Sequence, residues 1–262
     1  MEKVIAALWA PEGESHADYG ARLLATLPAA LADAGVDSVR LNVRDATVEP
    51  GAALIQSWQA PQQTAIAQFW MPSANARFRG AVDAVLAEHS ARFAAWVVCE
   101  STIIPNTAHL CSCYVSPGKR SEAEFSEAKR AEGEFSAAKQ VTPERTWGWS
   151  QASFISFRPD MTREAAIAHW HTHHTRVAIE TQSNFEYVQN LIVRPLTENA
   201  PAYDAIVEEC FPLEALDQPE AFYDAMGNAA KFDANLAAMM DSCAGFIDFT
   251  RIDVIPTSQF DF

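Results

Sequence analysis

Hydrophobic positions along the chain alternate between strand-like and helix-like spacing, and the elements they predict fall in the same order twice. Each half is expected to contain a strand, a helix, two strands, a second helix and a last strand. In the first half these elements are expected at residues 3–8, 16–34, 38–43, 64–71, 78–93 and 95–103. In the second half they are expected at residues 148–157, 163–182, 187–193, 203–211, 217–243 and 245–255.

The repeated order predicts how the two halves assemble. One βαββαβ unit covers its sheet with helices on one face, so that the other face is apolar and needs a partner sheet. Two units in one chain can supply that partner to each other. The sequence therefore predicts an α+β protein in which two tandem ferredoxin-like βαββαβ units form an intrachain dimeric α+β barrel. The expected boundaries are residues 1–104, a connector at 105–146 and residues 147–262.

The connector is rich in Ala, Glu and Lys and contains two similar segments, SEAEFSEAKR and AEGEFSAAK. This composition favours an exposed helix or a helical hairpin. The simpler interpretation is that this segment only connects the two halves. The alternative is a functional one, a lid over a pocket, because long connections in compact domains often have a function.

Composition narrows the classes of partner. Hydrophobic residues make up 49% of the chain, which supports a substantial core, and 34 acidic against 19 basic residues give a net charge of −15. Such a charge opposes binding to nucleic acid or to an anionic membrane. The chain contains no run of 18 apolar residues, and Pro11 interrupts the short apolar stretch at the N-terminus. We therefore expect a soluble, cytoplasmic protein.

The cysteines indicate neither a disulfide framework nor a metal site. They number five, without repeated spacing: Cys99, Cys111, Cys113, Cys210 and Cys243. Cys111 and Cys113 are too close for an ordinary structural zinc pair, and no second pair completes four ligands. We expect reduced thiols and no bound metal.

The densest chemical feature is the segment AHWHTHHTR in the first helix of the second half. It holds four of the seven histidines: His169, His171, His173 and His174. At about 100° per residue, Ile167, Trp170, His174 and Val177 share one face, which should turn toward the sheet. His171 flanks that face, whereas His169 and His173 pair on another side and are expected in solvent.

An isolated helical histidine is usually a core or surface residue without a chemical role, but His174 differs. It lies among apolar neighbours, where an imidazole needs a hydrogen-bond partner, and its usual pKa of about 6.5 suits proton transfer near neutrality. The strands expected beneath it carry polar side chains that a plain core would avoid. By strand parity Asp204 and Glu208 share one side, Tyr187 and Gln189 share a side of the preceding strand, and Asn190 faces the other way.

The motifs of the second half resemble those of the EthD family. The resemblance rests on FRPDMTREAAIAHWHTHHTRVA, on the YVQN that follows and on YDAIVEECF. They are similar to a family pattern of an Arg-Pro-x-Met-Thr/Ser turn, a helix with Trp and then His four residues later, a Tyr-Val-Gln strand and a Tyr/Phe-Asp-x-x-x-Glu strand. The likeness spans residues 147–256. The first half has only His16 and Tyr19 in its first helix, so it looks like a degenerate copy.

The resemblance implies a set of site residues. It places Arg158, Trp170, His174, Tyr187, Asp204 and Glu208 on family positions, although several relatives carry a histidine where this chain has Leu191. The resemblance also implies membership of the dimeric α+β barrel superfamily. In that superfamily the pocket commonly lies between the helices and the sheet of each unit, and His174 is expected to face that gap. We expect His174, Tyr187, Asp204 and His171 to act in catalysis, and Trp170, Asn190, Glu208 and Arg158 to bind substrate.

The main functional hypothesis is a cofactor-independent acid–base enzyme. It would be a lyase, such as a dehydratase, decarboxylase or cyclase, acting on a small apolar, aromatic or polyketide-like compound with a histidine as general acid or base. No cofactor is expected, and the chain could also form a homodimer beyond its internal pairing.

Three alternatives stay open. The superfamily includes haem enzymes, and His169 with His173 has the spacing with which a helix binds a divalent ion. The superfamily also includes cofactor-free monooxygenases, in which the substrate itself activates dioxygen. A non-catalytic ligand-binding or accessory protein is the alternative from another class.

Overall fold

The computed structural model describes residues 1–106 and 144–262. The helix or lid expected in the connector therefore lies outside the described residues, as do Cys111 and Cys113. In the part of the chain that is described, no helix is long and apolar enough to cross a bilayer.

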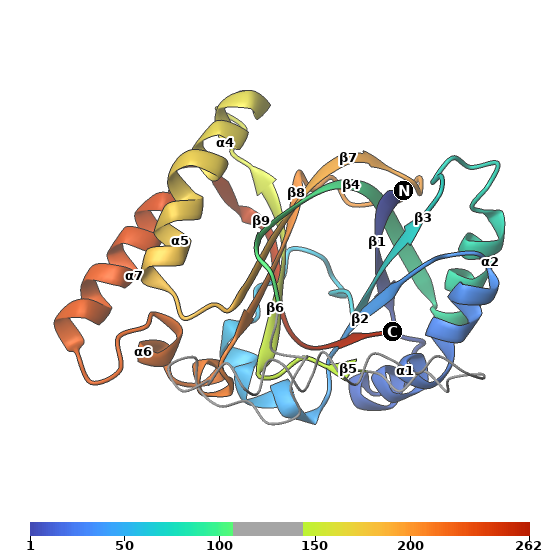
Figure 1. Ribbon diagram of the computed structural model, residues 1–262, viewed down its shortest axis with the longest axis horizontal. Coiled ribbons are helices and arrows are strands. Elements are labelled where there is room, and N and C mark those ends of the chain that lie inside the picture. Colours follow the sequence, from blue (N-terminus) through green and yellow to red (C-terminus); the bar gives the residue numbers. More distant parts are fainter. Residues whose placement is uncertain (107–143) are drawn as a thin grey trace, which may run out of the picture.

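Both halves contain the expected strands and helices (Figure 1). The first half comprises β1 (Glu2–Trp9), α1 (His16–Asp33), β2 (Val39–Val43), the 3-10 helix η1 (Ala46–Leu54), β3 (Ala65–Met71), α2 (Gly80–His89) and β4 (Arg92–Ile104). The second comprises β5 (Glu144–Arg145), β6 (Trp149–Phe157), α4 (Arg163–His169), the π-helix η4 (Trp170–His174), α5 (Thr175–Thr181), β7 (Glu186–Pro195), β8 (Ala205–Phe211), the 3-10 helix η5 (Leu213–Leu216), α6 (Pro219–Phe222), α7 (Ala229–Ala244) and β9 (Ile247–Asp261).

The strands form an antiparallel barrel. Their order among the described residues is β2-β3-β1-β4-β7-β8-β6-β9, and a further pairing of β2 with β9 closes the circle, while the short β5 adds to β9. The corresponding strands of the halves follow one order, β4-β1-β3-β2 and β9-β6-β8-β7. The halves meet at the β4–β7 and β2–β9 pairs. The expected mixed barrel of strands and helices is confirmed.

The helices cover the barrel from two opposite sides (Figure 1). Alternating strand residues point inward, and one core cluster, including Ile5, Trp96 and Phe154, fills the barrel. The outward residues of the second half pack under α4, α5 and α7 with Trp170 and Phe246. A third cluster, with Leu23 and Phe69, lies between the helices and the sheet of the first half. The apolar residues thus form one layer inside the barrel and one under the helices of each half, and the histidine helix belongs to the layer of the second half.

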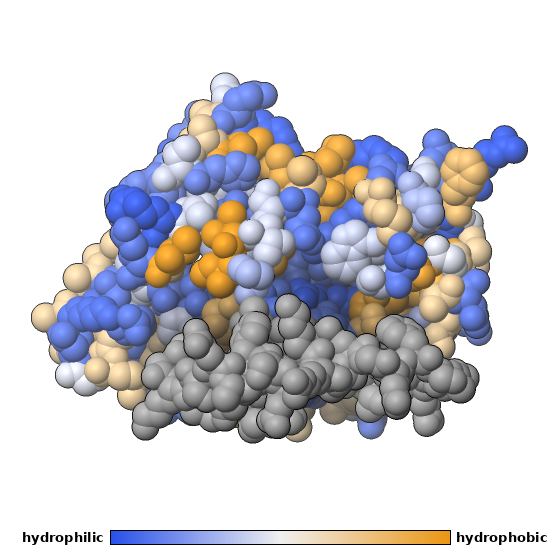
Figure 2. All heavy atoms as spheres, in the orientation of Figure 1, coloured by the Kyte–Doolittle hydropathy of each residue, from blue (hydrophilic) through white to orange (hydrophobic). Residues whose placement is uncertain are grey.

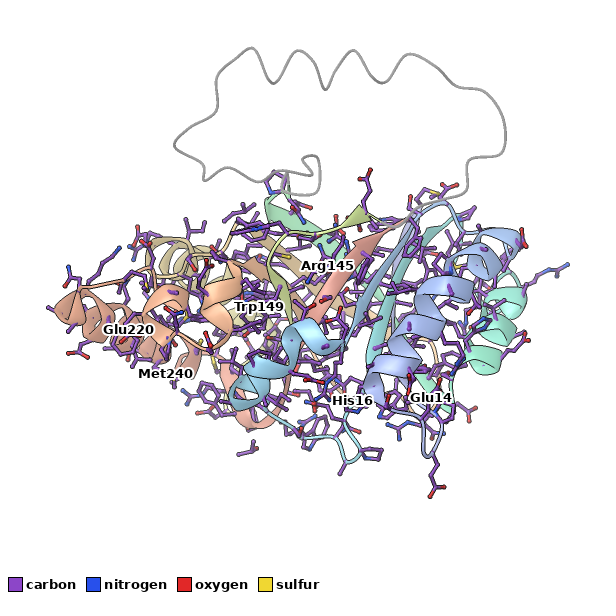
Figure 3. The ribbon with its side chains drawn as sticks, turned by 90° about the horizontal axis from the view of Figure 1, so that it is seen from below. Glu14, His16, Arg145, Trp149, Glu220 and Met240 are labelled. Atoms are coloured by element: carbon purple, nitrogen blue, oxygen red, sulfur yellow. The ribbon has the colours of Figure 1, made fainter. Side chains whose placement is uncertain are left out.

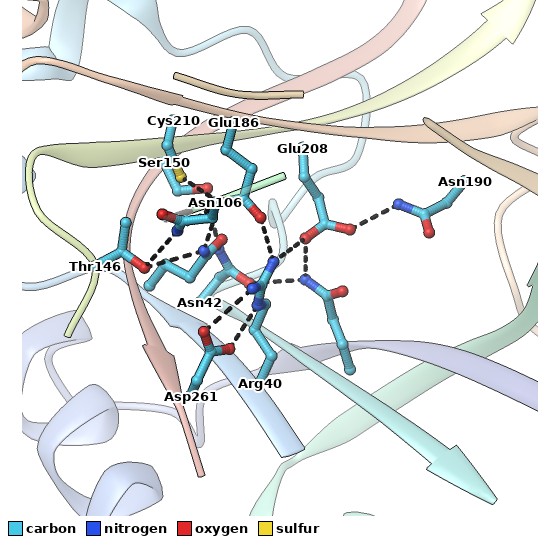
Figure 4. A network of polar contacts seen from close by, with 12 residues as sticks. Arg40, Asn42, Asn106, Thr146, Ser150, Glu186, Asn190, Glu208, Cys210 and Asp261 are labelled. Carbon is cyan, nitrogen blue, oxygen red and sulfur yellow. Dashed lines mark hydrogen bonds and ion pairs between the residues drawn. The ribbon is translucent and has the colours of Figure 1, made fainter. Parts of the chain in front are cut away.

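The barrel also encloses a polar network (Figure 4). Glu208 accepts from Asn190 Nδ2 at 2.6 Å, lies 3.2 Å from the ammonium of Lys3 and lies 3.6 Å from the guanidinium of Arg40. Arg40 also pairs with Glu186 at 2.6 Å. The strand parity expected for Glu208 is correct, but its side of β8 faces the barrel interior. Glu208 and Asn190 therefore lie on the opposite side of the sheet from the helices, which corrects their expected place beside His174.

The C-terminal residues TSQFDF differ most from expectation. The last strand was expected to end at Ile255. Instead β9 continues to Asp261, and residues 258–261 pair with Arg40–Val43 of β2. This pairing covers an edge of β2 that would otherwise leave its backbone groups unpaired.

Candidate active site

The histidine helix contains a π-helical segment that the sequence did not predict. Thr162 caps its start by accepting a bond from the backbone N–H of Ala165 at 3.2 Å. In η4 the N–H of Thr175 bonds the carbonyl of Trp170, five residues earlier, and the Thr175 hydroxyl donates to the same oxygen at 2.9 Å. Such single π turns occur frequently at functional sites. Trp170, His174 and Val177 are all buried, so the predicted inward face is observed.

His174 occupies the inner side of this helix. Its side chain is 9% exposed, its Nδ1 lies 3.0 Å from the hydroxyl of Ser242 in α7, and its ring centroid lies 4.9 Å from that of Phe246. Burial lowers the pKa of His174 to about 4, with smaller contributions in the same direction from His169 and His173. The imidazole is therefore neutral at physiological pH, with a free lone pair, although it is a weaker base than a histidine in water.

The other three histidines differ from expectation. His169 was expected in solvent, but it is partly buried: its Nε2 lies 3.0 Å from the carbonyl of Ser242 and its ring packs on Phe246. His173 is also partly buried, with its ring centroid 5.0 Å from that of His169. His171 is exposed and does not line the cavity described below. His169 is partly buried because α7 lies beside the histidine helix and covers the side that carries His169.

A cavity of about 460 Å³ lies between the helices of the second half and the outer face of its sheet. Its lining residues include Ile155, Trp170, His174, Gln182, Glu209, Leu216, Phe222, Tyr223, Met239, Phe246 and Ile252, and η1 of the first half contributes Pro50, Ala53 and Leu54. Met240 and Phe249 line the cavity but are 48% and 43% exposed, so they stand at its opening. Figure 3 shows Met240 among the helices of the second half. Figure 2 shows a largely hydrophilic face with hydrophobic side chains gathered over these helices.

Glu209 is the cavity residue that the sequence reasoning missed. It is 6% exposed, and its carboxylate accepts from Asn184 Nδ2 at 2.9 Å and from Gln151 Nε2 at 3.4 Å. Burial raises the pKa of Glu209 to about 7, although these two bonds partly offset the effect. The preceding glutamate has the opposite environment: burial alone would raise the pKa of Glu208, but Lys3 and Arg40 outweigh it and lower the pKa.

A signal for Glu209 was present in the sequence. Strand alternation puts Val207 and Glu209 on one face and Ile206 and Glu208 on the other. The pattern shows that the side chains of Glu208 and Glu209 point to opposite faces of the strand. It does not show which of the two faces is turned toward the helices, because both faces of this strand are apolar apart from them.

Tyr187 lies behind the cavity wall and does not line it. Its hydroxyl accepts from Trp170 Nε1 at 3.2 Å and from Gln189 Nε2 at 2.9 Å. Burial raises the pKa of Tyr187 well above its usual value. The phenol therefore stays protonated and holds the indole of Trp170, which does line the cavity.

Asp204 and Arg158 lie away from the cavity. Asp204 pairs with Arg163 at 2.5 Å and accepts from the backbone N–H of Phe157 at 2.8 Å, at the start of β8. Arg158 forms a surface ion pair with Asp160 at 2.5 Å. Both side chains are used in fixing the ends of strands and turns. Of the eight site residues expected from the sequence, only His174 and Trp170 line the cavity.

The comparison with known families agrees with this geometry. Residues 158–250 match the family model of the EthD domain. This match lies wholly within the second half of the chain, which is thus similar to an EthD domain. Its matched range contains His174, Trp170 and Glu209, while β6 and η1 add walls to the cavity from outside that range. The resemblance seen in the sequence is thereby confirmed.

Two further comparisons give little beyond the EthD domain. No curated protein matches the sequence. A solved structure described as a crystal structure study of an anthrone oxidase-like protein is similar, with a TM-score of 0.48 and 9% sequence identity, over 100% of this chain and 91% of that chain. A likeness of this degree carries no information on the reaction of this protein.

Proposed function

We propose that the protein is an enzyme that acts on a small, largely apolar aromatic or polyketide-like compound, with His174 transferring the proton. The observation that carries the proposal is a neutral, buried imidazole that faces a cavity of about 460 Å³. This volume lies within the range of small-molecule sites, about 300–1,000 Å³. The reaction class that we favour is a lyase, because proton transfer from carbon or oxygen is the chemistry a lone neutral imidazole supplies.

The hydrogen bonding of His174 supports its role as a base. Ser242 engages Nδ1 and so fixes the plane of the ring. Among the described residues, Ser242 is the hydrogen-bond partner of the ring, and none forms a hydrogen bond with its other nitrogen, Nε2. That nitrogen is available to a bound compound, and the Trp170 side chain beside it is fixed through Tyr187. A positioned general base of this kind contributes about 10²–10⁴-fold to a rate.

The strand order supports a proposal about architecture as well. Each half repeats the order of strands that a ferredoxin-like unit has, so we assign residues 1–104 and 147–262 to two such units. In the first half, α1 packs on the sheet with Leu23, Leu27 and Leu31. Among the described residues, the pair of Trp170 and His174 over the sheet belongs to the second half, and the helices of the first half have no such pair. This asymmetry supports catalysis in the second unit and a structural role for the first.

The test compares two histidines of one helix. Purified wild type, His174→Ala and His171→Ala are incubated with a panel of hydroxylated aromatic and polyketide-like compounds, and products are followed by mass spectrometry. His174→Ala should lower turnover by at least about 100-fold. His171→Ala is the matched control and should keep wild-type turnover, since its side chain is exposed.

Thermal unfolding of both variants shows whether the fold is kept. A folded His174→Ala protein with full turnover would overturn the role of His174. Consumption of dioxygen in step with the substrate would show an oxygenase and overturn the lyase assignment.

A further inference from the structure

We propose that Glu209 selects the ligand of the cavity: it accepts a hydrogen bond from the hydroxyl group of an uncharged aromatic compound and excludes compounds that carry a carboxylate or a phosphate. The inference rests on the proposed function in taking this cavity as the substrate site. It names the substrate class and assigns a recognition role to a residue outside the proton transfer itself.

Glu209 has unused hydrogen-bonding capacity toward the cavity. Its Oε1 accepts one hydrogen bond, from Asn184, and its Oε2 accepts one, from Gln151. A carboxylate has about four lone-pair positions, so each oxygen can accept a further bond. Since Glu209 lines the cavity, a ligand hydroxyl is the group that can supply that bond.

Positive charge is missing around Glu209. Among the described residues that line the cavity, none is a lysine or an arginine. Glu209 takes part in no ion pair with a described residue, whereas Glu208 pairs with Lys3 and lies 3.6 Å from Arg40. A ligand carboxylate or phosphate would therefore place a second negative charge in a region of low polarity with nothing to balance it.

The buried tyrosines, cysteine and histidine around Glu209 are uncharged near neutrality. Tyr187 lies in the wall behind the cavity, and burial raises its pKa well above the usual value. Burial likewise raises the pKa of Tyr223 and of Cys243 to about 12 each. His174 is neutral because burial lowers its pKa. The remaining cavity carboxylate, Asp217, is exposed at the surface and adds negative charge.

The surroundings favour an uncharged hydroxyl over an ammonium group. An ammonium ion would have to lose its hydration among apolar walls such as Leu216, Phe222 and Met239. Burial raises the pKa of Glu209 to about 7, which shows that the same surroundings penalise charge on the protein side. A phenol loses less hydration and still satisfies the carboxylate. Aromatic lining residues such as Phe222 and Tyr223 suit a flat ring system.

The test uses three probes on one ring system: a phenanthrol, the matching phenanthrene carboxylate and the matching aminomethylphenanthrene. Dissociation constants are measured by fluorescence for the wild type, for Glu209→Gln and for the control Glu214→Gln. The wild type should bind the phenanthrol at least about tenfold more tightly than the carboxylate at about pH 8.5. Glu209→Gln should bring the two affinities to within about threefold. Glu214→Gln should keep the wild-type ratio, because Glu214 is exposed and does not line the cavity.

A second measurement uses the wild type alone, so that the proposal stays open to refutation even if Glu209→Gln fails to fold. Lowering the pH from about 8.5 to about 5.5 protonates Glu209 while the carboxylate probe stays ionised. The ratio of the two affinities in the wild type should therefore shrink to within about threefold, and a ratio that does not change with pH would contradict the proposal.

Several results would overturn the proposal: no binding of the phenanthrol, equal affinities in the wild type, tighter binding of the amine than of the phenanthrol, or loss of the ratio in Glu214→Gln. Failure of the proposed function is distinguishable from these. If the ratio depends on Glu209 but no compound turns over, the cavity binds without catalysis. If turnover depends on His174 but the ratio does not depend on Glu209, only the assignment of Glu209 is wrong.

Discussion

At the scale of single residues, two adjacent glutamates show how strand geometry creates different chemistry from one residue type. Glu208 lies inside the barrel between cations, and Glu209 lies under the helices with amide partners alone. The pKa of Glu208 is lowered and that of Glu209 is raised to about 7. A one-residue step along β8 thus separates a structural ion pair from a cavity carboxylate.

The raised pKa of Glu209 has a consequence for stability. The folded state holds this proton more tightly than the unfolded state, whose carboxyl has the usual pKa of 4.5. Its contribution is therefore fully present below about pH 4.5 and is lost as the pH rises through about 7. The shift corresponds to at most about 3 kcal/mol.

Replacing this carboxyl should flatten the pH dependence. Between about pH 5 and 8, Glu209→Gln should gain free energy of unfolding relative to the wild type as the pH rises. His174 acts in the opposite direction below about pH 6.5, so the difference between the two proteins isolates Glu209. Urea unfolding at several pH values measures it. A difference independent of pH would contradict the raised pKa.

At the scale of elements, the π-helix η4 decides what the histidine helix presents to the cavity. Its wide turn is fixed by Thr175, whose hydroxyl donates to the Trp170 carbonyl and accepts from Gln189 Nε2 at 2.8 Å. Gln189 in turn donates to Tyr187, which holds Trp170. The turn and the strand beneath it are therefore joined through one threonine hydroxyl.

Removing that hydroxyl should loosen the turn. Thr175→Val should lower the free energy of unfolding by about 1–2 kcal/mol, because two bonds are lost and a buried amide donor loses a partner. Thr172→Val is the matched control: its hydroxyl bonds the Ala168 carbonyl from an exposed position, and its loss should cost less than about 0.5 kcal/mol. Chemical unfolding followed by circular dichroism measures both. Equal effects would show that the Thr175 contacts contribute nothing particular.

At the scale of the whole molecule, buried charges join the two halves. Lys3 and Arg40 come from the first half, and their partners Glu208, Glu186 and Asp261 come from the second. Arg40 also lies in the strand that pairs with the C-terminal end of β9. Closure of the barrel and pairing of the charges therefore occur together.

Removing a buried partner should destabilise the barrel more than removing a partly exposed one. Glu208→Ala leaves Lys3 and Arg40 less balanced in the interior and should lower the free energy of unfolding by about 3–5 kcal/mol. Asp261, with 27% of its side chain exposed, should cost about 1 kcal/mol when changed to Ala. Thermal and urea unfolding compare the two variants. A smaller loss for Glu208→Ala than for Asp261→Ala would refute the structural role of the network.

Patterns within single elements were enough to predict several features of this protein. Apolar alternation located the strands, helical spacing placed Trp170, His174 and Val177 on the buried face, and the motifs from Arg158 onward indicated the EthD domain. The alternation of side chains along a strand also puts Glu208 and Glu209 on opposite faces of β8. These features depend on neighbours along one element, which is the information a single sequence holds.

Three features follow from the fold and not from local patterns: which face of β8 meets the helices, the covering of His169 by α7, and the pairing of the last residues with β2. Each of these depends on segments far apart in the chain. Both faces of β8 are buried and each carries one glutamate, so the alternation of residues could not show which face is turned toward the helices. The assignment of Glu209 to the cavity, and of Glu208 to the barrel, follows from how the two sheets close on one another.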